Sequence, residues 1–315
     1  MNAEPLLSNI DFLHSDRYQA TLEKAEDGKI GLTHKAEIIW PDGVNRDSWV
    51  KIYRKQFSRG LVNEVIGYIL AGTLDLPQPE HAGFLMYPTD WIDENHKNEL
   101  SEIDLYRGYT IAWVTSDTQG MNLRIKLENL ESKPEELIRL YNLFKEDIKN
   151  WEKLPDLIAF DYAIHNEDRN LGNLLQLPNK KFCLIDHGEI LTSSNWGYWE
   201  LLSPKNNGWN MMNHYIQYFN EKFIDEGIFK DLATHNYLTS CYQNLPSNFK
   251  SSQAELLSHL KQMLNGESFN PPAPLPKVFV TDSIINFIEE RSENKQNFSE
   301  ECARLLGIPT DSLHS

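Results

Sequence analysis

The hydrophobic pattern of this 315-residue chain changes its period about a third of the way along the sequence. In the first third, apolar residues alternate with polar ones in short runs that end at turn residues, as is typical of β-strands. Beyond it, they recur every three or four residues, as is typical of amphipathic helices. We therefore expect an α+β fold, with a strand-rich part over residues 1–113 and a mostly helical part over residues 114–315.

The strand-rich part is divided by polar turns such as Asp27-Gly28 and Pro41-Asp42-Gly43. The turns separate antiparallel strands, and one apolar segment at helical spacing is ended by Pro77 and Pro79. The predicted strands cover residues 18–22, 36–40, 48–53, 82–87 and 106–114, and the predicted helix covers residues 62–74.

The helical part begins with a well-marked amphipathic segment that has Pro134 in its first turn. A later helix is expected to start at Ser252, because Glu255 follows three residues on and completes a capping box. The predicted helices cover residues 134–151, 154–164, 209–223, 252–264, 284–290 and 300–306.

Charge and hydropathy argue against a nucleic-acid-binding protein and against a membrane-spanning one. Acidic side chains outnumber basic ones by 46 to 30, and the net charge of −16 disfavours a broad nucleic-acid-binding surface. The N-terminus lacks the pattern of a signal peptide, and no apolar run approaches the roughly 18 residues that span a bilayer. We expect a cytoplasmic protein that contacts neither nucleic acid nor a membrane directly.

The most informative stretch for function contains Asp168 with Asn173 five residues later, then Asp186-His-Gly188 after an apolar run. Phosphoryl transfer needs an acceptor for the proton of the attacking hydroxyl and oxygen ligands for Mg²⁺. These residues supply both in that order, with Asp168 as the base and Asn173 and Asp186 as metal ligands. ATP is the expected phosphate donor. The alternative is that all three are ordinary turn residues.

A lysine upstream strengthens the phosphotransferase interpretation. Lys51 interrupts an apolar strand, and Glu64 lies on the helix that follows. In kinases such a pair holds the lysine on the phosphates of ATP. The alternative is a lysine that extends from an edge strand into solvent, with a solvated glutamate on the helix.

The order of these residues resembles the HipA-like serine/threonine kinases of bacterial toxin-antitoxin systems and their smaller relatives. The likeness runs from about Gly28 to Leu191 and includes Gly60-Leu-Val-Asn-Glu64-Val-Ile-Gly67 and the run from His165 to Gly188. It implies a two-lobed, protein-kinase-like fold. It also implies a protein substrate, which in the toxins is an aminoacyl-tRNA synthetase, or another translation protein, and an antitoxin partner.

The chain departs from that family in ways that bear on its substrate. Many relatives have histidine where Asn170 stands, and the chain looks too short for the additional N-terminal subdomain of the full-length toxins. The identity of the substrate is therefore not carried over.

The nucleotide is expected between the two parts of the chain. The segment from Gly28 to Lys35 stands where a phosphate-covering loop belongs, although a plain β-turn explains it equally well. The strand that ends in Trp113 and Val114 leads into a small polar connection, residues 115–120, whose backbone would face the adenine ring. Two histidines, His165 and His187, lack the spacing of a zinc site and are expected to hydrogen-bond to neighbours instead.

Two other functions remain open at this point. Aminoglycoside and phosphoinositide kinases share the same aspartate and asparagine arrangement, so a small-molecule or lipid kinase is the first alternative. A pseudokinase that binds nucleotide as an interaction module is the second. All the acidic metal positions are present, which argues against the pseudokinase.

Overall fold

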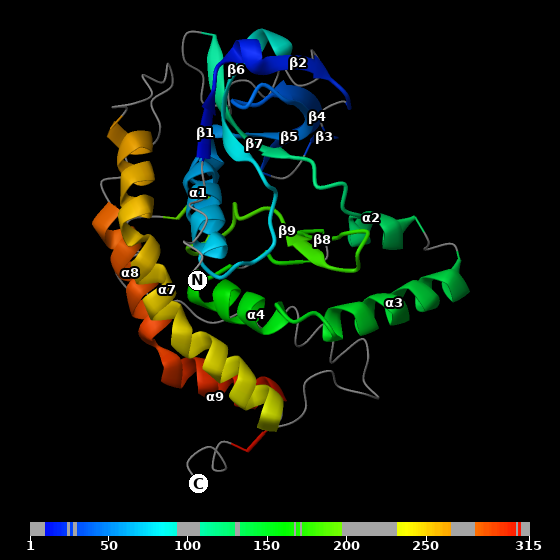
Figure 1. The fold of residues 1–315 in the computed structure, drawn as a ribbon, viewed down its shortest axis with the longest axis vertical. Coiled ribbons are helices and arrows are strands. Elements are labelled where there is room, and N and C mark those ends of the chain that lie inside the picture. The colour runs from blue at the N-terminus through cyan, green and yellow to red at the C-terminus, as the bar shows by residue number, and fades with distance from the viewer. Residues whose placement is uncertain are drawn as a thin grey trace.

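The computed structural model describes residues 10–23, 26–27, 30–92, 108–129, 133–166, 168–170, 172–196, 232–265, 281–306 and 308–309. Within these residues a twisted β-sheet forms one half of the molecule and helices form most of the other (Figure 1). The predicted helix at residues 209–223 lies outside the described residues.

The large sheet has the strand order β1-β6-β7-β5-β4-β2, with β3 paired to β4. Neighbouring strands are antiparallel, apart from β1 and β6, which run parallel. Its strands are β1 (Ile10–Leu13), β2 (Tyr18–Thr21), β3 (Glu26–Asp27), β4 (Gly31–Ile39), β5 (Asn45–Tyr53), β6 (Ala82–Pro88) and β7 (Tyr109–Ser116), and short 3₁₀ turns lie at Ser15–Arg17, Lys55–Phe57 and Thr89–Trp91.

The two faces of this sheet have different neighbours, because side chains alternate along each strand. On β5, Val50 and Ile52 belong to an apolar cluster on one face, whereas Lys51 and Tyr53 point to the other. On β7, Val114 lies in the first cluster, and Trp113 faces the same side as Lys51. The second face is therefore the one that can hold a ligand.

Helix α1 (Arg59–Gly72) packs against that second face. Almost all of its residues are buried, because it lies between the sheet and the helical half of the chain (Figure 1). A helix that is apolar around most of its circumference is expected in such a position.

The helical half is built around α4 (Leu154–Ala163), which packs against the long helix α7 (Leu232–Asn265). Helix α7 in turn packs on α8 (Thr281–Glu293) and α9 (Lys295–Leu306). A small hairpin, β8 (Leu174–Gln176) and β9 (Phe182–Leu184), lies between the sheet and α4 (Figure 1). Helices α2 (Leu123–Glu128) and α3 (Pro134–Lys149) extend to one side of it.

Most predicted elements are present, although several of their bounds differ. The helix expected to start at Ser252 begins earlier, at Leu232, and the Ser252 hydroxyl donates to the carbonyl of Phe249 inside α7 instead of capping a helix. The expected loop at residues 28–35 is largely strand, because Thr33 and Lys35 belong to β4. Strand β7 crosses the predicted boundary at 113/114 and ends at Ser116.

The fold class is α+β, as expected, with a strand-rich half and a mostly helical half. A strand carries Lys51, the next helix carries Glu64, and the hairpin and helices follow. Within the described part of the chain, no helix combines the length and apolar character needed to cross a membrane.

The buried histidine of the sheet makes stability depend on pH. His34 is 3% exposed, its Nε2 lies 3.2 Å from the Tyr18 hydroxyl, and burial lowers its pKa to about 4. Between pH 6.5 and 4 the unfolded chain therefore binds a proton that the folded chain does not, so folding is weakened as the pH falls. The nearby Tyr18 and Tyr87 are neutral throughout this range, and burial raises the pKa of each further above it.

We therefore expect His34 to remove about 2 kcal/mol from the free energy of unfolding between pH 7 and pH 5. Urea unfolding of wild type and His34→Gln at both pH values measures this, and the variant should lose correspondingly less. The exposed His14, changed to Gln, is the matched control and should keep the wild-type decrease. An equal decrease in wild type and His34→Gln would contradict the prediction.

Candidate functional site

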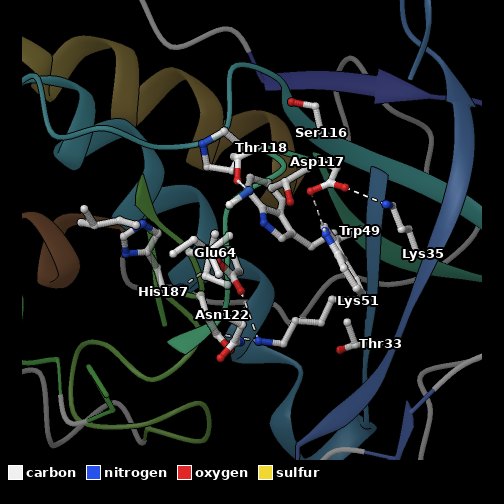
Figure 2. A pocket seen from close by; sticks show the side chains of 18 of the residues that line it. Thr33, Lys35, Trp49, Lys51, Glu64, Ser116, Asp117, Thr118, Asn122 and His187 are labelled. Carbon is white, nitrogen blue, oxygen red and sulfur yellow. Dashed lines mark hydrogen bonds and ion pairs between the residues drawn. The ribbon is translucent and has the colours of Figure 1, made fainter. Parts of the chain in front are cut away.

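A cavity of about 680 Å³ opens between the sheet, the hairpin and the connection that follows β7 (Figure 2). This volume is in the range of small-molecule sites. Its wall on the sheet side comes from β4, β5 and β7, and the opposite side includes Leu175, Leu184 and Asp186. Both halves of the molecule contribute to it.

Lys51 is the central charged residue of the cavity. Its Nζ lies 2.6 Å from Oδ1 of Asp186 and 3.3 Å from Oε1 of Glu64. The fold therefore brings together the three predicted residues, Lys51, Glu64 and Asp186, which lie in separate parts of the sequence. Glu64 also accepts from the Tyr53 hydroxyl at 2.8 Å and from the backbone N–H of His187 at 2.9 Å.

Burial and charge act in opposite directions on this cluster. Burial would lower the pKa of Lys51, but the carboxylates of Asp186 and Glu64 outweigh it and raise that pKa. Burial would raise the pKa of Asp186, but Lys51 lowers it below its usual value. For Glu64 burial dominates, and the pKa is raised. Lys51 therefore stays charged beside an ionised Asp186.

Glycines allow the elements of the cluster to approach one another. A Cβ at Gly67 of α1 would lie 2.3 Å from Cβ of His187, and one at Gly188 would lie 2.2 Å from the Tyr53 hydroxyl oxygen. Both separations are too short for real side chains. The glycines near Glu64 and after Asp186 are thus needed for close packing.

The segment after α4 carries Asp168 and Asn173. The Asn173 amide donates to Oδ2 of Asp168 at 3.0 Å and to its carbonyl at 2.6 Å, and the Asn170 amide donates to Oδ1 at 3.1 Å. Asp168 is exposed, whereas Asn173 is 9% exposed. Two asparagines therefore hold an accessible carboxylate in one orientation.

Asn173 and Asp186 come from adjoining segments, because the backbone N–H of Ile185 donates to the Asn173 carbonyl at 3.2 Å. Among the described residues, no group of three or more His, Cys, Asp or Glu side chains could hold a metal ion. Mg²⁺ commonly takes only one or two protein carboxylates and completes its shell with phosphate and water. Asp186 supplies one such carboxylate at the cavity, whereas Asn173 is joined to the same segment but does not line the cavity.

A buried ion pair supports this segment from behind. The Arg169 guanidinium is 0% exposed and binds both carboxylate oxygens of Asp161, with Nε 3.0 Å from Oδ2 and Nη2 3.1 Å from Oδ1. Arg169 also donates to the Ile185 carbonyl at 2.7 Å and lies 3.2 Å from Nδ1 of His187. Burial and then Arg169 lower the pKa of His187, which keeps the ring neutral. The expected bonding role of His187 is thus observed.

Of the two residues predicted to contact a nucleobase, Trp113 and Val114, only Trp113 lies at the cavity. Trp113 lines the cavity, but the Val114 side chain is fully buried in the cluster on the opposite face of the sheet. The reason is the alternation of side chains along β7. Residues 115–120 line the cavity instead, so the expected polar connection lies at the site.

Two features of the site are absent from the sequence-based predictions. Lys35 forms ion pairs with Asp117 at 2.7 Å and with Asp47 at 3.1 Å, and Trp49 points into the cavity beside them (Figure 2). The signal was present for Trp49, because it stands two residues before Lys51 and must share its face. No local pattern could pair Lys35 with Asp117.

Comparison with known proteins adds little to this geometry. No family model matches the chain. A glycoprotein of Adelaide River virus is 23% identical over 185 residues, which are 55% of this chain and 23% of that protein, so the chain spans less than a quarter of that relative's length. The crystal structure of the Helicobacter pylori proinflammatory kinase CtkA aligns over 95% of this chain and 100% of that one, with a TM-score of 0.46 and 13% identity.

Helix α1 is joined to the segment after Asp186 by one buried side chain, Asn63. Its amide nitrogen lies within hydrogen-bond distance of the carbonyls of Gly188, Ile190 and Ser193, at 2.7, 3.0 and 2.9 Å. Its Oδ1 accepts from the Trp196 indole at 2.9 Å. This network fixes the helix that carries Glu64.

Changing Asn63 to Asp keeps the shape but replaces the donor by a buried carboxylate that faces three carbonyls. We expect the free energy of unfolding to fall by about 2–4 kcal/mol. The same change at the exposed Asn195, which accepts from Arg59 at 3.1 Å, should leave stability within about 0.5 kcal/mol. Chemical denaturation of both variants tests this, and equal effects would show that the Asn63 network contributes nothing specific.

Proposed function

We propose that the protein is an ATP- and Mg²⁺-dependent phosphotransferase of the protein-kinase type, with a serine or threonine hydroxyl of a protein as acceptor. The single observation that carries the proposal is the contact of Lys51 with both Glu64 and Asp186 at the wall of the cavity. A protein kinase needs this lysine and glutamate pair and an aspartate for the metal in one place.

Lys51 binds and orients the phosphates of the nucleotide. Glu64 positions the Lys51 ammonium, and Glu64 is itself fixed by Tyr53 and by the backbone N–H of His187. The charge on Lys51 is maintained at neutral pH, because the two carboxylates raise its pKa. A permanently charged donor at the phosphates lowers the energy of the transition state by electrostatic stabilisation.

Asn173 and Asp186 are the residues that would hold Mg²⁺. When bound, Mg²⁺ supplies positive charge that neutralises the transferring phosphoryl group. The lowered pKa of Asp186 keeps this carboxylate ionised and ready to bind the metal, although burial alone would favour its protonated form.

Asp168 accepts the proton of the attacking hydroxyl. Its exposure gives an acceptor access to the carboxylate, and the amides of Asn170 and Asn173 orient both of its oxygens. A base of this kind needs a fixed direction within hydrogen-bond reach of the hydroxyl. The choice of a protein acceptor rests on the likeness of this run to the HipA-like kinases, and a small molecule or lipid as acceptor remains the alternative outcome.

Two substitutions at the site separate fold from chemistry. Asp186→Asn should abolish phosphoryl transfer while the chain stays folded, because a neutral amide is a much weaker Mg²⁺ ligand than a carboxylate. Asp168→Asn should keep the affinity for ATP and lose transfer, because only the proton acceptor is removed.

The measurements are transfer of radiolabelled phosphate from ATP to proteins of a cell lysate, ATP affinity and thermal melting. Asp75→Asn is the matched control, because Asp75 is exposed and does not line the cavity. Unchanged transfer in Asp186→Asn would refute the metal role. Label found only in small metabolites or lipids, and never in a protein band, would replace the protein acceptor by a small one.

Lys51 and Glu64 should act as a unit. Each residue changed to Ala should lower the rate of transfer, and the double variant should lose clearly less than the sum of the two effects, because both changes remove the same positioned ammonium. Steady-state rates of the four proteins complete a double-mutant cycle. Strictly additive losses in activation free energy would show that Glu64 does not act through Lys51.

A further inference from the structure

Strand β5 presents a large aromatic side chain to the cavity beside the lysine. Trp49 precedes Lys51 by two residues, so both side chains project from the same face of the strand, about 7 Å apart along it. Trp49 is 37% exposed although it lines a cavity, and Figure 2 shows its ring directed inward above Lys51. The Lys35 ammonium lies over the ring, 6.0 Å from its centroid, and the exposed fraction leaves further ring surface that a ligand can contact.

Asp117 holds the indole in place. Its Oδ1 accepts from Trp49 Nε1 at 3.4 Å and from the backbone N–H of Gln119 at 3.0 Å, and its Oδ2 lies 2.7 Å from Lys35 Nζ. Lys35 is anchored on its other side by Asp47 at 3.1 Å. One carboxylate thus joins the indole to β4 and to the connection after β7.

Part of the opposite wall of the cavity is apolar. Leu175 and Leu184, from the two strands of the hairpin, line the cavity together with Trp49. A flat heteroaromatic ring that enters between them meets an aromatic surface on one side and aliphatic carbon on the other. Its substituents can then extend along β5 toward Lys51.

We infer that Trp49 is the stacking platform for the base of the bound nucleotide, and that Asp117, braced by Lys35, positions the indole for it. This inference rests on the proposed function, because it takes the ligand to be a nucleoside triphosphate whose phosphates reach Lys51. Stacking recognises the face of the ring, so it determines affinity for the nucleotide more than the choice among bases.

The test measures ATP binding by isothermal titration calorimetry for wild type and three variants at position 49. Trp49→Ala should weaken binding about tenfold or more, the usual effect of losing one base–aromatic stack. Trp49→Phe should restore affinity to within a few-fold of wild type, because phenylalanine can stack. Trp49→Leu, which is apolar but not aromatic, should remain weak.

Trp91→Ala is the matched control. Trp91 is 43% exposed, much as Trp49 is, but it contacts Tyr18 and Tyr87 on the far face of the sheet. Its removal should leave ATP affinity unchanged, and thermal melting of all variants shows whether they are folded.

Wild-type affinity in folded Trp49→Ala, or equal affinity in the Leu and Phe variants, would overturn the inference and leave the proposed function intact. The expected binding pattern without any phosphoryl transfer would overturn the proposed function and leave the inference intact. A wild-type protein that does not bind ATP would overturn both.

Discussion

Lys51 lies between two carboxylates that come from different parts of the fold, Glu64 on α1 and Asp186 after β9. Buried charges are tolerated only when they are paired and hydrogen-bonded, so each member constrains the other two. The sheet, α1 and the hairpin segment must be assembled together for the lysine to remain buried and charged. One cation against two carboxylates leaves an excess of negative charge, which suits a site that we propose to hold Mg²⁺.

The same contact determines how closely the elements pack. For Glu64 to reach Lys51 while it accepts from the His187 backbone, α1 must lie directly against the segment that follows Asp186. Gly67 and Gly188 make this approach possible, and Asn63 secures it through the carbonyls of the same segment. Apolar packing holds α1 against the sheet, whereas directional hydrogen bonds determine its position relative to the site.

Sequence patterns predict what depends on local periodicity. The helices that contain Glu64 and precede Asp168, and the strand that contains Lys51, were all predictable because apolar spacing reports burial. Strand β1 was not predicted, because its pairing with β6 involves residues 10 and 82, which no local pattern connects. The Lys35 and Asp117 ion pair likewise joins segments that no local pattern connects. Alternation along β7 places Val114 on the face opposite the cavity, contrary to the prediction.

Backbone strain shows that the helical half contributes to the site as well. His165 and Asp186 have φ values of 53° and 60°, a left-handed conformation that costs about 1 kcal/mol or more for residues other than glycine. At Asp186, two hydrogen bonds compensate for the cost of this conformation. The Gly188 N–H donates to Oδ1 of Asp186 at 3.1 Å, and Arg169 donates to the Ile185 carbonyl.

At His165, the cost of this conformation is compensated by hydrogen bonds from α8. Arg291 of that helix donates to the carbonyls of Tyr162 and Ala163 at the end of α4. Arg291 is itself held by the Tyr242 hydroxyl of α7, which donates to its carbonyl. The turn that leads to Asp168 is therefore stabilised by Arg291, which lies more than 100 residues further along the chain. The conformation of the site therefore depends on the packing of α4, α7 and α8 as well as on the sheet.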